Sequence, residues 1–192
     1  MSDKPRYPRA DAIAVARELV RALTWHCLAD RIVVAGSLRR RKAEAGDVEI
    51  VYIPRMSESQ APCDLFGRTE PRVVNIADEA LGGLLECGII EQRKNINGAA
   101  SWGAQNKYAR HVASGIPVDF FATSSEAWWN YLVCRTGGAA NNTEIASRAK
   151  ARGWHWNPYG PGFSRGLETR AMHSERDVHE RAKILAAMRV EV

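Results

Sequence analysis

Asp47 and Glu49 are the residues of this chain whose types and spacing are best suited to chemistry. Both lie in the run GDVEI at residues 46–50, which leads into an apolar, β-branched segment. Side chains alternate along a strand, so carboxylates two residues apart point to the same face. Carboxylate oxygens are ligands that Mg²⁺ prefers, and the pair could hold a divalent cation. The structural alternative is two acids on the exposed side of a half-buried strand, which is what an isolated Asp-x-Glu would favour.

A glycine–serine turn followed by four cations precedes this pair. An apolar β-branched run at 32–34 leads into Gly36 and Ser37, and the cations occupy residues 39–42. Backbone N–H groups of such a turn, with cations beside them, suit a phosphate chain. Metal ligands beside a phosphate-binding turn predict a nucleoside triphosphate as substrate.

A third acid, Asp119, lies inside the apolar run at 116–121. A carboxylate in an apolar strand is costly to bury unless it binds a metal or another partner. A position at the edge of a sheet would explain it equally well. The residue alone does not decide between a functional and a structural role.

Length and composition fit an ordinary soluble globular protein of one domain or two small ones: 192 residues, 45% hydrophobic and 26% charged. The net charge of +5 favours an anionic partner such as nucleic acid. The apolar runs are too short to span a membrane, and the N-terminus lacks the apolar core of a signal peptide. We therefore expect no membrane partner, a monomer, and a cytoplasmic location or one with the nucleoid or DNA of a prokaryotic or viral system. Four scattered cysteines predict neither a disulfide framework nor a zinc knuckle.

The hydrophobic pattern predicts the elements that must position these residues. Apolar residues at spacings of three and four predict an amphipathic helix over residues 10–29. Residues 54–75 are rich in proline and polar residues without periodicity, which predicts a surface loop. A short helix is expected at 76–86, where Gly88 supplies a glycine cap.

Strands and further helices are expected in the second half of the chain. Residues 89–96 and 107–112 should pair as strands, with the hairpin signal Asn97-Gly98 after the first. The aromatic-rich segment 126–135 predicts a helix. Helices are also expected at 142–152 and, after a Ser174 capping box, up to 188, with short strands and turns over 154–170 between them.

The ordered combination Gly36-Ser37, Arg39-Arg40 and GDVEI at 46–50 resembles the signature of the nucleotidyltransferase superfamily, and most closely that of the family X DNA polymerases. The resemblance runs from Arg6 to the C-terminus. It implies an α+β fold: a nucleotidyltransferase palm, with a mixed β-sheet flanked by helices, at residues 1–122. A small thumb that contacts the nascent base pair and DNA would occupy residues 123–192. The lyase and fingers domains of larger members have no counterpart in the chain.

The resemblance implies a template-directed DNA polymerase that adds dNTPs to a primer 3′-hydroxyl on primer–template or gapped duplex DNA, in short-gap repair or replication. Asp47, Glu49 and Asp119 would be the catalytic ligands of two Mg²⁺ ions, for which Mn²⁺ could substitute. The implied nucleotide-binding residues are Gly36, Ser37, Arg40, Arg6, Thr136, Gly137 and Asn142, and the implied DNA-binding residues are Arg148, Lys150 and Arg152. A solvated basic tail for Arg6 and a helix-surface amide for Asn142 remain open alternatives.

Three departures from the family pattern bear on specificity. Glu49 replaces the usual aspartate, Cys134-Arg135 replaces a Tyr-Phe pair before Thr-Gly, and Ala146 replaces an arginine that contacts the template. The smaller thiol and the added guanidinium predict weakened discrimination against ribonucleotides. Two other functions stay open: an untemplated transferase acting on a 3′ end, a small molecule or a protein, and a catalytically idle nucleic-acid-binding module.

Overall fold

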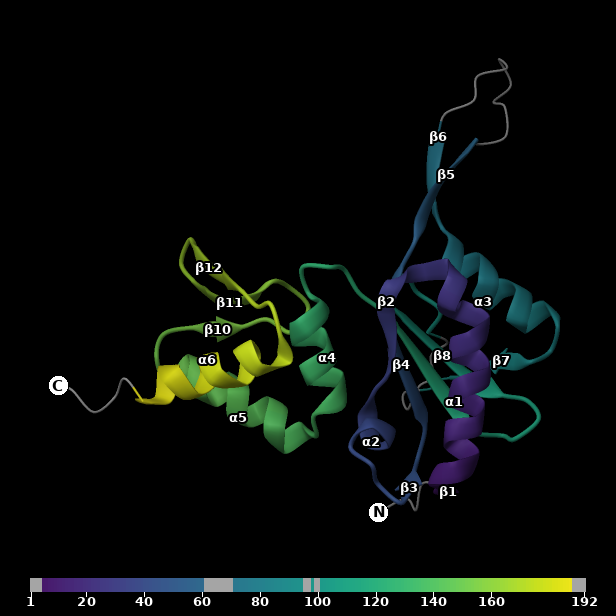
Figure 1. Ribbon diagram of the computed structural model, residues 1–192, viewed down its shortest axis with the longest axis horizontal. Helices are drawn as coiled ribbons and strands as arrows, with labels where there is room; N and C mark the ends of the chain where they lie inside the picture. The colour runs from purple at the N-terminus through teal and green to yellow at the C-terminus, as the bar shows by residue number, and fades with distance from the viewer. Residues whose placement is uncertain (1–4, 61–70, 95–97, 99–100, 188–192) are drawn as a thin grey trace.

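The chain is built around a mixed five-stranded sheet (Figure 1). The computed structural model of the protein describes residues 5–60, 71–94, 98 and 101–187. In their order across the sheet, the strands are β2 (Cys27–Val34), β4 (Val48–Pro54), β9 (Pro117–Ala122), β8 (Asn106–His111) and β7 (Ile90–Gln92). β4 and β9 are parallel, and the three other neighbouring pairs are antiparallel. The predicted α+β class, with a mixed sheet flanked by helices, is confirmed.

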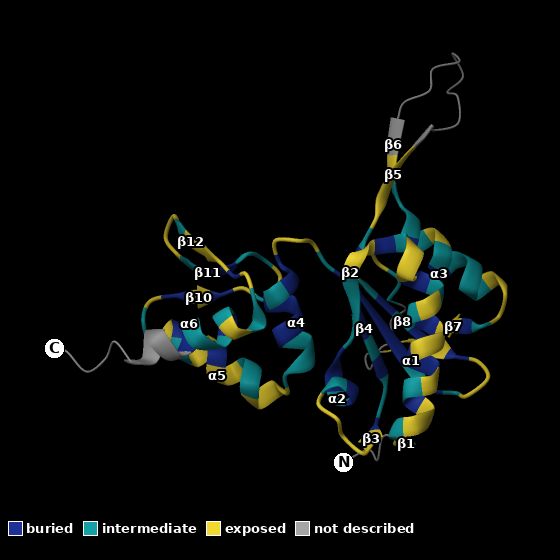
Figure 2. Cartoon of the chain, in the orientation of Figure 1, coloured by how far each residue is buried: buried dark blue, intermediate teal, exposed yellow. Residues whose placement is uncertain are grey.

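One face of the sheet carries the main hydrophobic core. Even-numbered side chains of the two central strands, such as Ile50 and Phe120, are fully buried there. Two helices, α1 (Arg9–Leu23) and α3 (Ile76–Glu86), contribute apolar side chains to the same cluster. Their outer sides remain exposed, as Figure 2 shows along α1. Amphipathic helices therefore cover this face of the sheet.

The opposite face divides into a covered part and a part that carries the acids. Val51 and Phe121, odd-numbered residues of β4 and β9, pack against α4 (Trp128–Thr136). Glu49 and Asp119 have the same parity and lie nearer the N-terminal ends of these strands. Alternation along two neighbouring strands thus places both acids on the face that α4 covers in part.

The C-terminal part of the chain has an apolar cluster of its own, formed by residues such as Trp154 and Phe163. It lies beside the sheet in Figure 1, and α4 joins the two. Trp129 of α4 packs against this cluster and against the α4 side of the sheet. The elements are α5 (Ala139–Lys150), β10 (His155–Trp156), β11 (Gly162–Arg165), β12 (Glu168–Ala171) and α6 (Glu175–Ala187).

The predicted helix over residues 10–29 is wrong at its C-terminal end. α1 ends at Leu23, a 3₁₀ turn spans Thr24–His26, and the chain enters β2 at Cys27. Leu28 continues the helical spacing of apolar residues, but its side chain is 39% exposed in β2. Backbone pairing with β4 prevails over the helical pattern there.

The predicted surface loop over residues 54–75 is wrong at both of its ends, because they form a hairpin. β5 (Met56–Gln60) pairs antiparallel with β6 (Pro71–Asn75), and the hairpin projects beyond α3 (Figure 1). Met56 and Val73 stay 57% and 60% exposed. The two strands are hydrogen-bonded to each other, and no side chain is buried among those of their residues whose burial is described, so no hydrophobic period marks them. Residues 61–70 lie outside the described part of the chain.

The remaining predicted elements are confirmed, with shifted ends. The side chain of Asn75 accepts hydrogen bonds from Ala77 N and Asp78 N, which begins α3 as an N-cap does. At the start of α6, Ser174 Oγ accepts from Asp177 N at 3.0 Å. The first predicted strand of the second half shortens to β7, and Asn97 of the hairpin signal lies outside the described residues. Among the described helices, none is long and apolar enough to cross a membrane.

A buried asparagine ties α4 to the C-terminal strands and generates a stability prediction. Asn130 is fully buried; its Oδ1 accepts from Trp156 Nε1 at 3.0 Å, and its Nδ2 donates to the Pro161 carbonyl at 3.0 Å. Asn130→Ala would leave the buried indole N–H without a partner, so it should lower the free energy of unfolding by about 1–3 kcal/mol. Urea unfolding measures the loss. The exposed-site control Glu126→Ala should change it by less than about 0.5 kcal/mol, and equal values for the two variants would contradict the assignment.

Candidate active site

Glu49 and Asp119 are direct neighbours in the sheet. They form one register pair between the parallel strands β4 and β9, on the face that α4 covers in part. Asp47 immediately precedes β4, two residues before Glu49. The structure thus brings two of the three predicted acids side by side and places the third at the end of the same strand.

The Glu49 carboxylate lies against the backbone of the glycine–serine turn. A Cβ atom at Gly36 would fall 1.6 Å from Glu49 Oε2, and Gly36 has a φ of +59°. No side chain fits at this position, and a left-handed backbone favours glycine there. Ala35 N donates to the Glu49 carbonyl at 2.8 Å, which fixes the turn to β4. Beyond it, Ser37 Oγ is buried and has no hydrogen-bond partner among the described residues.

Both neighbouring acids hold protons more tightly than usual. Burial, then the negative charges of Asp47 and Asp119, raise the pKa of Glu49 to about 7. Burial also raises the pKa of Asp119 to about 6; the Arg93 guanidinium opposes this rise, and the charge of Asp47 adds to it. The site therefore concentrates negative charge that the surrounding cations only partly neutralise.

Arg93 is a site residue that sequence reasoning missed. Its guanidinium forms an ion pair with Asp119 Oδ1 and donates from Nε to the Ala109 carbonyl at 3.1 Å. It also lies 5.0 Å from the ring centre of Tyr108. Arg93 directly follows β7, and β8 lies between β7 and β9. The register of these three strands brings the Arg93 side chain next to Asp119. Because that register is a property of the fold, spacing along the chain gave no signal for it.

Arg135 lies over two aromatic rings in the same region. Its guanidinium is 3.7 Å from the ring centre of Phe121 and 5.1 Å from that of Tyr131. Arg135 also acts on both neighbouring acids, lowering the pKa of Glu49 and of Asp119. This cation is therefore directed at the site rather than at open solvent.

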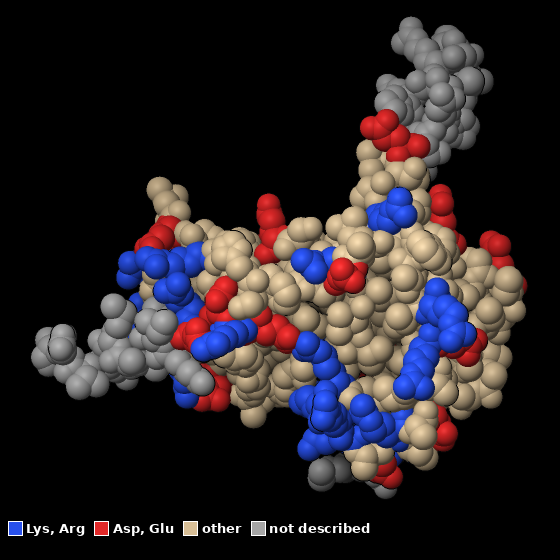
Figure 3. Space-filling model, in the orientation of Figure 1, with Lys and Arg blue, Asp and Glu red and all other residues tan. Residues whose placement is uncertain are grey.

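Cations of the turn connect it to the C-terminal part of the chain. Arg39 pairs with both carboxylate oxygens of Glu175, at 2.5 and 2.6 Å, and donates to Thr136 Oγ1 at 3.0 Å. Arg40 donates to the Thr136 carbonyl. The predicted residues Arg40 and Thr136 therefore meet at one point beside Gly36. Figure 3 shows Lys and Arg side chains gathered over the region of α2 (Gly36–Arg39).

Arg6 is also brought to the acidic turn. β1 (Tyr7–Pro8) pairs with β3 (Glu44–Ala45), so the residue before β1 lies close to the one after β3. A Cβ atom at Gly46 would lie 3.9 Å from Arg6 Nη1. Arg6 therefore stands next to the residue that precedes Asp47.

The other predicted thumb residues have local partners or lie at a different hollow. Asn142 Nδ2 donates to the Cys134 carbonyl at 2.8 Å, and a Cβ atom at Gly137 would lie 2.8 Å from Asn142 Oδ1. Arg148 pairs with Glu144 one turn earlier in α5. Lys150 lines a separate hollow of about 610 Å³ between α5 and β10–β11. Arg152 is half-buried just beyond the end of α5.

The donors beside the turn suit a hard divalent cation. Within the described residues, no three His, Cys, Asp or Glu side chains converge as a ready-made metal site. The fit lies in the donor chemistry, because Glu49 and Asp119 offer carboxylate oxygens from adjacent strands. A bound cation would reduce the repulsion between these carboxylates and offset the free-energy cost of burying their charges. Carboxylates whose charge is only partly neutralised are ligands that Mg²⁺ accepts.

No model of a known protein family matches this chain, and no curated protein matches it either.

Proposed function

We propose that this protein is a nucleotidyltransferase and, within that class, a template-directed DNA polymerase with a palm at residues 1–122 and a thumb at 123–192. The observation that carries the proposal is the register pair of Glu49 and Asp119 with the Gly36 turn pressed against Glu49. Adjacent carboxylates next to a turn with a spare buried hydroxyl and nearby cations suit a metal-bound triphosphate.

Each residue of the site has a role in this proposal. The carboxylates of Asp47, Glu49 and Asp119 would hold two Mg²⁺ ions, which lower the pKa of a bound hydroxyl and neutralise phosphate charge. Ser37 Oγ, which has no partner in the part of the chain that the structure describes, would donate a hydrogen bond to a phosphate oxygen. Arg40 and Arg6 would offset the charge of the leaving group, since positioning and electrostatics dominate this kind of transfer.

The reaction is a displacement at the α-phosphorus of the incoming nucleotide. A bond forms between the acceptor 3′-oxygen and the α-phosphorus while the bond to the bridging oxygen breaks, and pyrophosphate leaves. The hydroxyl proton passes to a carboxylate oxygen of Asp119.

An untemplated transferase is the second candidate, and the engagement of the expected template readers favours it. The Asn142 amide is used by the Cys134 carbonyl, and Arg148 is paired with Glu144. Incorporation of a labelled nucleotide on a gapped duplex and on a single strand, each with Mg²⁺, separates the candidates. A polymerase follows the template base, whereas an untemplated transferase extends the single strand equally well.

Neutralising either neighbouring acid should abolish transfer without unfolding the protein. We expect Glu49→Gln and Asp119→Asn to slow incorporation by on the order of 10²–10⁴-fold, because each removes a ligand and Asp119→Asn also removes the proton acceptor. Single-turnover incorporation measures the loss. Glu91→Gln is the matched control, since Glu91 is an exposed carboxylate paired with Arg110 on β7 and β8. Near-normal incorporation by Asp119→Asn would refute the assignment.

Glu49 should destabilise the metal-free protein at neutral pH and above. Its folded pKa of about 7 exceeds the unfolded value of roughly 4.3, so the folded state binds more protons between these values and stability falls as pH rises. Glu49→Gln should therefore be more stable than the unaltered protein at about pH 8, by on the order of 1–3 kcal/mol, with no gain at about pH 4. Urea unfolding with a chelator present measures both differences.

Added Mg²⁺ provides the control for this stability measurement. It should raise the unfolding midpoint of the unaltered protein at about pH 8 and have much less effect on Glu49→Gln, because a ligand binding the native state stabilises it. A Glu49→Gln protein that gains no stability at the higher pH would contradict the buried-charge argument.

A further inference from the structure

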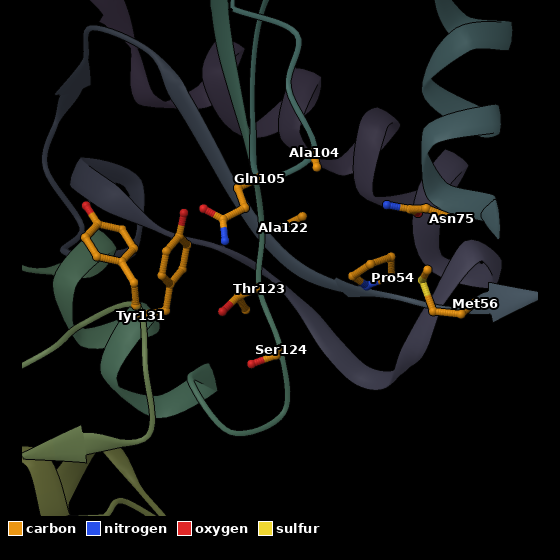
Figure 4. A pocket seen from close by; sticks show the side chains of 10 residues that line it. Pro54, Met56, Asn75, Ala104, Gln105, Ala122, Thr123, Ser124 and Tyr131 are labelled. Carbon is orange, nitrogen blue, oxygen red and sulfur yellow. The ribbon is translucent and has the colours of Figure 1, made fainter. Parts of the chain in front are cut away.

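A hollow with neutral walls lies at the C-terminal ends of the two central strands, away from the acids (Figure 4). Its volume is about 250 Å³, and Tyr131, Tyr159, Gln105 and Thr123 are among its lining residues. None of the described residues that line it carries a charge. Tyr159 is 55% exposed and stands 5.5 Å from the ring of Tyr131, edge to face. The hollow offers a planar ring beside amide and hydroxyl groups.

A continuous row of guanidinium and aromatic groups begins at the acids. Arg93 forms the ion pair with Asp119 and lies 5.0 Å from the ring centre of Tyr108. The ring of Tyr108 meets that of Phe121 edge to face, at 6.5 Å. These residues belong to or follow neighbouring strands, so the sheet holds them in place.

The row continues from Phe121 to the hollow. Arg135 stacks 3.7 Å above Phe121 and donates from Nη2 to Tyr131 Oη at 3.3 Å. Tyr131 in turn lines the hollow together with Tyr159. Asp119 and Phe121 point to the same face of β9, and Thr123 lies directly beyond its end. Four residues of extended chain span about 13 Å. The acids and the hollow are therefore two ends of one row of contacts. Phe121 and Tyr131 are buried within it, and Arg93, Tyr108, Arg135 and Tyr159 keep part of their side chains at the surface.

The chemistry of this surface matches an unpaired stretch of nucleic acid. Guanidinium groups held against rings attract phosphates, and a ring beside neutral hydrogen-bonding groups accepts a base by stacking. An isolated anion would leave the hollow unused, and an apolar peptide would offer no negative charge to the guanidinium groups of Arg93 and Arg135. We propose that the row and the hollow hold a single-stranded nucleic-acid segment, with one unpaired base seated beside Tyr159. The proposal rests on the proposed function for its direction, since the segment then leads to the acids.

Binding without catalysis tests the proposal. Fluorescence anisotropy of a labelled single-stranded oligonucleotide, in chelator and without nucleotide, does not depend on transfer. Tyr159→Ala should weaken binding about 5- to 100-fold, equivalent to the roughly 1–3 kcal/mol of one stacked base. Tyr159→Phe should retain the affinity, because it keeps the ring. The matched control is Val112→Ala, an exposed residue just beyond β8 at the other end of the sheet, which should change affinity by less than about twofold.

Either the acceptor strand or the template strand can supply the unpaired base, and abasic residues distinguish these two sources. In one series the abasic residue is moved stepwise from the 3′ end of the acceptor, and in the other along the unpaired template of a gapped duplex. A loss of affinity at one position, absent in Tyr159→Ala, identifies the strand that supplies the base.

Unchanged binding by Tyr159→Ala, or affinity that is independent of abasic position in both series, would overturn the proposal. These outcomes are separable from failure of the proposed function. A protein that binds through Tyr159 but transfers no nucleotide would refute the enzyme and leave the seated base standing.

Discussion

The close approach of the Glu49 carboxylate to the Gly36 backbone is the contact on which the site depends. It joins the central strand to the turn that follows β2, and it leaves no room for any side chain at residue 36. The parallel pairing of β4 with β9 then fixes Asp119 beside Glu49. Burying two carboxylates together is unfavourable, as their raised pKa values show, and helices on the other face supply the apolar packing that holds the strands in register.

Short-range periodicity was enough to predict the acids and most helices. The predicted strand contains Glu49, whereas Asp47 lies just before it. The Ser174 capping box marked the start of α6, and Gly88 marked the end of α3. Contacts set by pairing between distant strands could not be predicted in this way. Arg93 reaches Asp119 only through the registers of β7, β8 and β9. The hairpin of β5 and β6 was missed because none of its residues with described burial is buried, and such pairing has no hydrophobic period.

Arg39 and Arg40, the first two cations after the turn, already stabilise the fold through bonds to the C-terminal part of the chain. Arg39 holds Glu175 of α6 and the Thr136 hydroxyl, while Arg40 holds the Thr136 carbonyl. The phosphate-binding cations expected from sequence are therefore already hydrogen-bonded to the C-terminal part. A bound anion at this turn would compete with those bonds, so occupancy there and the position of α4 and α6 are energetically linked. Arg135, stacked on Phe121, lies between the same two parts of the chain.

The hairpin of β5 and β6 leaves the body and returns to it at a single point. Met56 pairs with Asn75, Arg55 N bonds to the His26 carbonyl, and Ile76 N bonds to the Arg55 carbonyl. These hydrogen bonds hold the two ends of the hairpin together. Lengthening the segment between β5 and β6 would therefore cost little closure entropy. The hairpin is therefore the place where a segment of different length or sequence can replace the present one with the least effect on the strands that carry the carboxylates.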